Sequence, residues 1–415
     1  MKQDLDQLMQ ERKIDAAVVV GGAHNNPTMY YMIQGAPISS GILVKPCGRA
    51  PVLIHHTMER DEALKSGLKT MSLTDLDYAG LRMASENTLT ADVKLYRKLF
   101  QALDVSGRVA FYGMGERGAS YVLLQALDDA LEDVTVTGEY EHDIFDVARA
   151  TKDADEIARM RRAGQATSKI MRETMDFIQN HQVVRRSQQG SDIETLVKQD
   201  GTPLTIGDVK RFVRSRLFLY ELEDPEGMIF ATGRDAGVPH SKGEAEAALC
   251  LGQSIVFDLF PREMGGGYFH DMTRTFCLGY APPEVKKAYQ DVKTCFEQVV
   301  AALEPGAPTR RYEALTCDIF ESQGHNTHRV DRSKHSGYVH SLGHGTGLKI
   351  HGRPRFGLMD SNQDTLQPGA VFTIEPGLYY PEQGFGVRLE DTFYLDEDGQ
   401  FHSLTDLEKT LVLEM

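Results

Sequence analysis

The order of apolar and polar residues predicts strands alternating with helices along the first 150 residues. Helical patterns, in which apolar residues recur every three or four positions, begin at Asp4 and Ala119. Short apolar runs rich in β-branched residues are typical of strands. These runs begin at Asp15, Gly41, Ala50 and Arg108. The alternation indicates an α/β domain, which we place over residues 1–150.

The pattern changes near residue 150, where a long amphipathic helix is predicted. Asp153 and Glu156 have the spacing of a capping box, and apolar residues follow along one side of the helix. Thr205 and Asp208 predict the start of another helix. After Gly233 the pattern favours strands, with further helices among them. Those helices begin at Pro282 and Thr309, and the last strand patterns begin at Gly369 and Gly386. We therefore place a second domain over residues 151–415.

The stretch HSLGHGTGLKIHGRP, residues 340–354, places His344 and His351 among several glycines. Glycine weakens a helix interior by roughly 1 kcal/mol relative to alanine, and it is used where the backbone turns or approaches another group closely. One interpretation is a loop that brings one or both imidazoles to a common point. The other is two polar loop histidines without a shared role, and this stretch alone favours neither.

The composition argues against several classes of function. Among 415 residues there are 45 Lys and Arg against 60 Asp and Glu, a formal net charge of −15. Such a balance repels phosphate backbones and anionic lipids, so we expect no nucleic-acid or membrane partner. The N-terminus has no apolar signal segment, and no run approaches about 18 apolar residues, so we expect a soluble cytoplasmic protein. The 5 cysteines lack paired spacing and are interpreted as reduced thiols.

Four acidic residues interrupt apolar strand patterns. Burial of an unpaired carboxylate is costly, and neighbouring carboxylates repel one another unless a cation lies among them. Oxygen ligands with one imidazole suit divalent manganese, cobalt, zinc or iron, and bridging carboxylates suit two ions about 3.5 to 4 Å apart. The acids are Asp258 in IVFDLF, Asp271 in YFHDMTRT, Glu375 in VFTIEPG and Glu390 in GVRLEDT. Asp258 and Asp271 flank a predicted hairpin turn, which can set them opposite each other. With a histidine framed by glycines, these residues predict a two-metal hydrolytic site.

A glycine-rich segment, GMGERG at residues 113–118, offers a rival function from another class. It follows a predicted strand and opens a predicted helix, and Glu139 lies about 20 residues further on, as in dinucleotide-binding turns. The segment arrives after three earlier strands and not at the first strand–helix unit, which favours an ordinary turn. A nicotinamide enzyme or nucleotide-binding module is the alternative that it supports.

Five ordered motifs resemble those of the pita-bread metallopeptidases, the family of Xaa-Pro aminopeptidases, prolidases and methionine aminopeptidases. The motifs are PHSKG, DLF...HDMTRT, SLGHGTGLKIHG, TIEPGLY and GVRLEDT. The preceding α/β domain is similar to that of the prolidase and Xaa-Pro aminopeptidase branch. The resemblance implies an α+β pita-bread catalytic domain over residues 151–415. It also implies an enzyme, expected to be a homodimer, that cleaves small peptides between an N-terminal residue and a following proline.

The resemblance implies a role for each matching residue. Asp258 would bind one metal, and Asp271 and Glu390 would bridge both metals. His344 and Glu375 would complete the second site. A hydroxide bridging the two ions would attack the peptide bond, and Glu375 would pass its proton to the leaving amine. The implied cofactors are two divalent ions, manganese first and cobalt, zinc or iron otherwise. The residues that would position the substrate or support the site are His240, His351, Arg388 and His340.

The chain departs from the family's pattern in two places. Asp258 and Asp271 are 13 positions apart, a wider spacing than the family commonly has, and Gly352 follows His351 where the family usually carries an acid. Insertions in loops are tolerated thermodynamically, so the departures bear on the substrate more than on the metals. A metal-dependent hydrolase or lyase of the same fold, acting on a small molecule that is not a peptide, is therefore the alternative within the family.

Overall fold

The computed structural model describes residues 4–188 and 191–415, and the chain divides into two compact units. The first unit comprises the chain up to Arg149 together with Gly265–Gly267, and the second comprises Ala150–Met264 and Tyr268–Met415. Each unit has its own hydrophobic core. Within the described ranges, no helix combines the length and the apolar character needed to cross a membrane.

A six-stranded mixed sheet is the centre of the first unit, with the strand order β4-β3-β2-β1-β5-β6. β1 runs parallel to β5 and antiparallel to β2. The four residues Ala16–Val19 of β1 are all buried, as expected for a central strand. The strands are β1 (Ala16–Val20), β2 (Gly41–Pro46), β3 (Val52–His55), β4 (Lys69–Ser72), β5 (Gly107–Gly113) and β6 (Val134–Thr137).

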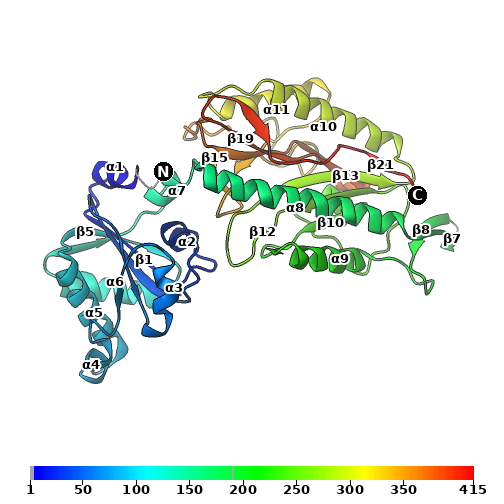
Figure 1. Ribbon diagram of the computed structural model, residues 1–415. Coiled ribbons are helices and arrows are strands. Elements are labelled where there is room, and N and C mark those ends of the chain that lie inside the picture. The colour runs from blue at the N-terminus through cyan, green and yellow to red at the C-terminus, as the bar shows by residue number, and fades with distance from the viewer. Residues whose placement is uncertain (1–3, 189–190) are drawn as a thin grey trace. The chain divides into compact units, whose positions relative to one another are not determined.

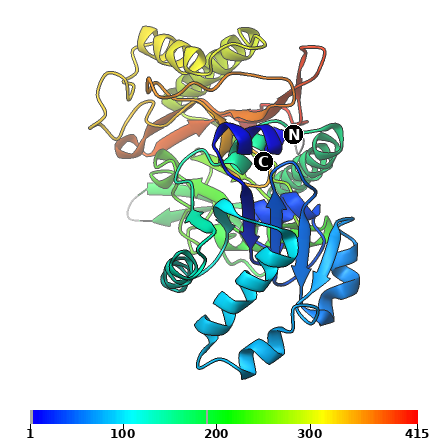
Figure 2. The same cartoon turned by 90° about the vertical axis from the view of Figure 1, so that its left-hand side faces the viewer.

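Helices pack against this sheet, and Figure 2 turns the first unit toward the viewer. Leu95, Leu99 and Leu103, spaced four residues apart on α5, join Val18 and Val109 of the sheet in one core. The helices are α1 (Asp4–Glu11), α2 (Pro27–Ile33), α3 (Arg60–Leu64), α4 (Tyr78–Met83), α5 (Thr88–Leu103), α6 (Arg117–Ala130) and α7 (Ile144–Ala148). The α/β character expected of this half of the chain is confirmed.

Capping boxes start the two helices on one side of the second unit, α8 (Ala154–Gln179) and α9 (Ile206–Leu219). Asp153 accepts from the backbone N–H of Glu156, whose carboxylate accepts from the N–H of Asp153. Thr205 and Asp208 form the same reciprocal pair. Both predicted helix starts are therefore confirmed, and in each the side chains satisfy backbone donors that the helix leaves unpaired.

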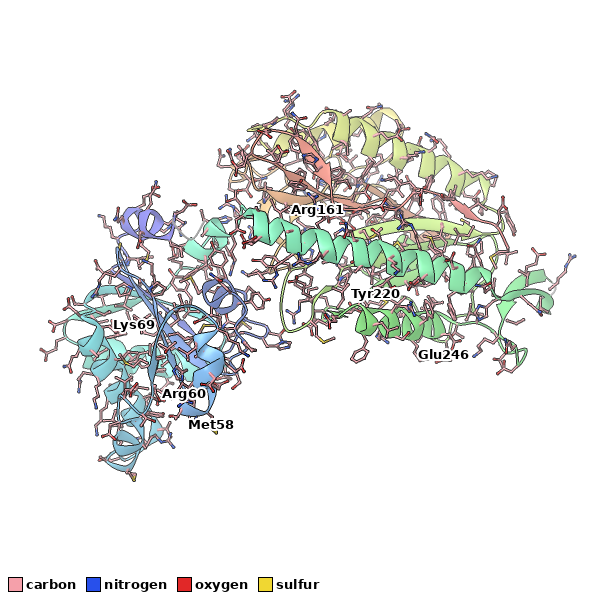
Figure 3. The ribbon with its side chains drawn as sticks, in the orientation of Figure 1. Met58, Arg60, Lys69, Arg161, Tyr220 and Glu246 are labelled. Carbon is pink, nitrogen blue, oxygen red and sulfur yellow. The ribbon has the colours of Figure 1, made fainter. Side chains whose placement is uncertain are left out.

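Polar side chains join α8 to its neighbours, and two of them are labelled in Figure 3. Arg161 donates to the Tyr394 hydroxyl at 2.6 Å, and its guanidinium lies over the same ring. Tyr220, directly after α9, donates its hydroxyl to Glu173 of α8 at 2.7 Å. These contacts attach α8 both to a strand and to α9.

Two sheets form the middle layer of the second unit, with the orders β10-β11-β13-β21 and β15-β14-β16-β19-β20. Three short pairs accompany them, β7 with β8, β9 with β12 and β17 with β18. The strands are β7 (Gln182–Gln188), β8 (Ser191–Val197), β9 (Leu222–Glu223), β10 (Ile229–Thr232), β11 (Ser254–Leu259), β12 (Arg262–Glu263), β13 (Met272–Leu278), β14 (His344–Gly345), β15 (Gly352–Arg355), β16 (Val371–Ile374), β17 (Gly377–Tyr380), β18 (Phe385–Arg388), β19 (Asp391–Leu395), β20 (Phe401–Ser403) and β21 (Val412–Leu413).

Helices cover this layer on two sides (Figure 1). α10 (Pro283–Ala301) and α11 (Arg310–Ser322) share a core with β16, β17, β18 and β19. α8 and α9 share another core with β10, β11 and β13. The sheets therefore lie between two helical layers.

Two runs that the sequence predicted as single strands are each broken in two. GAVFTIEPGLYY forms β16 and β17, which belong to different sheets, with Glu375 and Pro376 between them. Pro376 has no N–H to donate to a strand ladder, so the strand ends there. GVRLEDTFYLDEDG forms β18 and β19, with Leu389 and Glu390 between them. The two glutamates singled out by the sequence therefore lie where strands are interrupted.

Candidate metal centre and active site

Asp258 and Asp271 come from the four-stranded sheet. β11 pairs with β13 in a register that sets Asp258 opposite Thr273. Asp271 lies two residues before Thr273, directly ahead of β13, so its side chain is expected on the same face as that of Thr273. The predicted hairpin is confirmed, but the residue opposite Asp258 is Thr273 and not Asp271, because the wide turn between the strands shifts the register.

His344, Glu375 and Glu390 come from the second sheet or its strand ends. His344 starts β14, Glu375 follows β16 and Glu390 precedes β19. The backbone N–H of Glu390 donates to the carbonyl of Thr273 at 3.1 Å, which joins the two sheets at this point. This junction brings together acids that are more than a hundred residues apart in the sequence.

The ring of His344 faces two of the carboxylates. Its Nε2 lies 3.5 Å from Oδ2 of Asp271 and 3.5 Å from Oε1 of Glu375. Its Nδ1 bonds to the carbonyl of Gly345 at 3.2 Å, which makes Nδ1 the protonated nitrogen. Burial and the neighbouring His351 lower the pKa of His344 to about 3, so the imidazole is neutral. Its Nε2 lone pair therefore points at acidic oxygens, an arrangement that favours a cation between them.

Several buried carboxylate oxygens at this junction have no hydrogen-bond partner among the described residues, namely Asp258 Oδ1, Asp271 Oδ1 and Glu390 Oε1. Burial raises the pKa of Asp271, and the negative charge of Glu390 and Asp258 raises it further. Burial and Glu390 raise the pKa of Glu375 in the same way. Burial and Asp258 raise the pKa of Glu390 to about 8. Unpaired oxygens, mutual repulsion and one neutral imidazole are the donor set that divalent metal ions bind.

Arg388 is the cation that the described structure places in contact with this cluster. It donates to Oδ2 of Asp258 at 2.6 Å and to the Thr273 hydroxyl at 3.0 Å. It also donates to the Tyr379 hydroxyl at 2.7 Å and to the carbonyl of Pro239 at 3.3 Å. Arg388 thus neutralises one carboxylate, and its donors are engaged by the protein itself.

Tyr379 connects Arg388 to His340. The Nδ1 of His340 donates to the carbonyl of Ser341 at 2.7 Å, so its Nε2 accepts from the Tyr379 hydroxyl at 2.8 Å. Burial and Arg388 lower the pKa of His340 to about 3. His340 is therefore neutral with both nitrogens satisfied, as befits a supporting residue. The sequence analysis assigned no role to Tyr379, although this residue ends the motif TIEPGLY.

A cavity of about 570 Å³ opens onto these residues. His240 and His351 line it and are exposed, unlike the metal-binding candidates beneath them. The ring of His351 lies 4.4 Å from that of His344, centroid to centroid. The prediction that residues 340–354 bring both imidazoles together is therefore confirmed, but the stretch is a loop between two short paired strands, β14 and β15, and His344 lies in the first of them. Lys242, from the motif PHSKG, and Glu226 also line the cavity and are exposed, and the sequence analysis assigned neither of them a role.

The GMGERG segment has a different environment from that of a phosphate-binding turn. Glu116 is the N-cap of α6 and accepts from the N–H of Ala119 at 2.7 Å, so a carboxylate occupies the helix end where a phosphate would bind. Glu139 accepts from the Tyr112 hydroxyl and the N–H of Ile144. The Glu116 carboxylate thus lies where a dinucleotide phosphate would have to bind, which argues against the rival function. The segment is an ordinary strand-to-helix turn.

Comparison with known proteins places this site in a family. The sequence model of metallopeptidase family M24 matches residues 158–397, more than half of the chain. The chain belongs to metallopeptidase family M24. This M24 chain is 25% identical over 420 residues to the Xaa-Pro dipeptidase of Pyrococcus furiosus, which covers 99% of this chain and 100% of that protein.

Solved M24 structures confirm the predicted fold over the whole chain. The Xaa-Pro dipeptidase from Bacillus anthracis aligns with a TM-score of 0.75 at 21% identity, covering 99% of both chains. The X-Pro aminopeptidase from Thermotoga maritima aligns with a TM-score of 0.71 at 21% identity, covering 100% of this chain and 99% of that one. An α/β domain followed by a pita-bread domain is therefore the fold of this M24 metallopeptidase, and its family implies divalent metal ions.

Without metal, the M24 chain should lose stability as the pH rises from about 6.5 to about 8.5. The pKa of Glu390 in the folded protein, about 8, exceeds its ordinary value of 4.5, so the folded state binds more protons than the unfolded state between these values. The lowered pKa values of His340 and His344 have the opposite effect, but only below about pH 6.5. Urea unfolding in the presence of a chelator should show that the free energy of unfolding falls by an amount on the order of 2 kcal/mol over this pH range.

Excess Mn(II) is the control for this measurement, because a bound cation favours the ionised carboxylates and should abolish or reverse the slope. A metal-free protein whose stability is constant over this pH range would contradict the raised pKa of Glu390.

Proposed function

We propose that this protein is a metal-dependent exopeptidase that hydrolyses the bond between an N-terminal residue and a following proline. The observation that carries the proposal is a cluster of buried carboxylates beneath a cavity of peptide size. Two of its oxygens lie 3.5 Å from Nε2 of the neutral His344 ring, and three other oxygens have no hydrogen-bond partner among the described residues. A relative that matches along the full length is a Xaa-Pro dipeptidase. The family and the site chemistry thus support the same activity.

The residues proposed to hold two divalent ions are Asp258, Asp271, His344, Glu375 and Glu390. When bound, the ions would supply positive charge for the developing oxyanion and lower the pKa of a water molecule at the site. The ligand atoms of Asp271, His344 and Glu390 lie within 4.8 Å of one another, close enough to share an ion. Four carboxylates and one imidazole suit manganese, with cobalt, zinc or iron as alternatives.

The protein's own groups would then handle the proton and the substrate. Glu375 faces the cavity with a raised pKa, so it can accept a proton from the attacking water and pass it to the leaving amine. His240 and His351, exposed in the cavity, would contact the scissile peptide group. Arg388 and His340, whose donors and acceptors are engaged with the protein, would hold Asp258 and the loop behind it in place.

The test is the release of the N-terminal residue from a Xaa-Pro dipeptide and a Xaa-Pro-Yaa tripeptide, with and without added Mn(II). Metal-dependent cleavage of at least one peptide is expected, and a matched Xaa-Ala peptide should be cut far more slowly. If neither proline peptide is cut while the protein binds two metal ions, the peptidase proposal fails. A metal-dependent hydrolase or lyase that acts on a small molecule other than a peptide would then be the better interpretation of the same site.

Lys242 should contribute to the choice of peptide length. Lys242 is an exposed residue that lines the cavity, and its ammonium donates to the carbonyl of Glu226 at 2.6 Å. The protein engages four of the five N–H donors of Arg388, which is buried, so the exposed Lys242 is the more accessible of these two cations for the free carboxylate of a dipeptide. Lys242→Met should raise KM for a Xaa-Pro dipeptide about three- to tenfold, since an exposed charged hydrogen bond has a modest effect.

The matched substrate is the same dipeptide with a C-terminal amide, whose KM should not change in the Lys242→Met variant. Lys287→Met, which alters an exposed lysine on α10, controls for the general loss of a charge. An equal change in KM for the acid and the amide would show that Lys242 does not recognise the carboxylate.

A further inference from the structure

A buried carboxylate lies behind the proposed metal centre, outside the cavity. Glu313, on α11, is fully buried. Its Oε1 accepts from His328 Nε2 at 2.8 Å and from the Tyr338 hydroxyl at 2.8 Å, and its Oε2 accepts from the backbone N–H of Leu342 at 2.6 Å. In the described part of the chain, no lysine or arginine forms an ion pair with Glu313. Its basic neighbour is the histidine His328. Because burying a carboxylate is costly, such a site calls for a reason beyond packing.

Two of the three groups that donate to Glu313, Tyr338 and Leu342, belong to the segment that carries the site histidines. Tyr338 and Leu342 lie on either side of His340, and His344 follows two residues after Leu342. The carbonyl of Leu342 accepts from the backbone N–H of Glu375 at 2.7 Å. One peptide segment is thus held by Glu313 on one side and joined to Glu375 on the other.

The path of this segment leaves little freedom for adjustment. A Cβ on Gly343 would lie 2.1 Å from the carbonyl oxygen of Thr373, so the backbone is pressed against β16 there. The N–H of His344 donates to the Thr373 hydroxyl at 3.1 Å. A shift at Leu342 would therefore be transmitted to His344 and Glu375, since neither the backbone at Gly343 nor its contacts can absorb it.

We propose that Glu313 is a positioning residue, whose carboxylate fixes the segment 338–344 so that His344 and Glu375 are presented to the metal ions in their binding geometry. The inference rests on the proposed metal site but not on the identity of the substrate. Replacing a residue that orients a metal ligand by hydrogen bonds commonly weakens metal affinity by about 10- to 100-fold.

A separate metal site built from Glu313, Cys317 and His328 is the competing interpretation, because atoms of these side chains lie within 4.8 Å of one another. Two observations argue against it. Both oxygens of Glu313 already accept hydrogen bonds from the protein. Burial raises the pKa of the Cys317 thiol to about 12, so without a bound metal ion the thiol is protonated and a metal ion would have to displace this proton. The competing site is nevertheless tested by the same experiment.

The experiment compares Glu313→Gln with the wild-type protein in Mn(II) titration calorimetry, thermal unfolding and peptidase kinetics. A glutamine has one acceptor oxygen, so either Leu342 or the His328 and Tyr338 pair would face an N–H₂ group instead of an acceptor. We expect a folded protein whose Kd for Mn(II) is about 10- to 100-fold weaker. Excess Mn(II) should restore most of kcat, and KM should change little.

Matched variants separate the outcomes. Tyr338→Phe removes one hydrogen-bond donor to Glu313 without changing the ring and should weaken Mn(II) binding a few-fold. This variant tests the proposal if Glu313→Gln does not fold. Cys317→Ala lies on the same helix and should leave the Kd and the number of bound Mn(II) ions unchanged. The proposal is overturned if Glu313→Gln lowers the unfolding temperature with an unchanged Kd, or if Cys317→Ala reduces the number of bound ions. Wild-type protein that binds no Mn(II) would instead refute the metal site itself.

Discussion

Replacing Asp271 by asparagine should remove nearly all peptidase activity and yet make the metal-free protein more stable. Burial raises the pKa of Asp271 most, and the neighbouring Glu390, Asp258 and Glu375 raise it further. The Oδ1 atom of Asp271 has no hydrogen-bond partner in the described structure. Without a cation this carboxylate must either stay charged beside its neighbours or take up a proton, and both cost free energy at about pH 8, so an amide of the same shape removes this cost. With metal present, the loss of a ligand should reduce kcat/KM on the order of a thousandfold or more.

Asp391 provides a matched control for this prediction. It is buried in the same part of the fold, but it is paired with Arg274 at 2.7 Å and with Lys409. Asp391→Asn leaves a buried arginine without its full counter-charge, so it should destabilise the protein by about 3 to 5 kcal/mol whether or not metal is bound. The opposite signs of the two changes in unfolding free energy, measured by urea denaturation with a chelator at about pH 8, would distinguish a metal-binding carboxylate from a structural one.

If Asp271→Asn instead destabilises the metal-free protein as Asp391→Asn does, the carboxylate cluster is held by interactions within the protein. In that case the raised pKa values would not report a site for cations. Metal content measured on both variants completes the comparison, because only Asp271→Asn should bind less Mn(II) than the wild type.

Features that depend on neighbouring residues in the sequence could be predicted. The capping boxes at Asp153 and Thr205 are reciprocal bonds across three residues, so their spacing is sufficient to find them. Helix α5 carries a comparable signal, because Asn87 caps it and leucines recur every four residues, but it was not among the predicted helices. Local chemistry therefore predicts where elements begin more reliably than how they pair.

Features that depend on pairing between distant segments could not be predicted. The polar stretch after residue 181 has no apolar periodicity, and the structure makes strands there because β7 and β8 pair with each other and Thr195 pairs with Cys250. The breaks at Glu375 and Glu390 arise because the adjoining strands enter different sheets. Acids in apolar runs pointed to the site, but the register that opposes Asp258 to Thr273 is set by the whole sheet.

Supporting residues were the hardest to find in the sequence. Tyr379 ends the motif TIEPGLY and Glu313 lies in an ordinary helical pattern. The role of each appears only when the fold brings Arg388 or Leu342 within hydrogen-bond distance. A charged or hydroxyl group in an apolar pattern indicates that it has a partner but not which one. The metal-ligand candidates stood out because several acids shared one unusual context, whereas each supporting residue stands alone in its own segment.

Glu375→Gln should separate metal binding from turnover. The carboxylate faces the cavity, its Oε1 lies 3.5 Å from the His344 ring, and burial raises its pKa toward the range of a general acid or base. Glutamine keeps an oxygen donor for a metal ion but cannot carry a proton. We therefore expect kcat to fall by about 10²- to 10⁴-fold, while KM and the Kd for Mn(II) change by less than about tenfold.

The control for this variant is Glu382→Gln, whose side chain is 88% exposed and which should leave kcat and the Kd for Mn(II) unchanged. If Glu375→Gln loses Mn(II) in proportion to its loss of activity, Glu375 is a ligand and nothing more. If it keeps both metal and turnover, the proton passes through another group, and the exposed His240 and His351 are the next candidates. Only loss of kcat with retained metal supports a proton shuttle, because a ligand role alone predicts that the two quantities fall together.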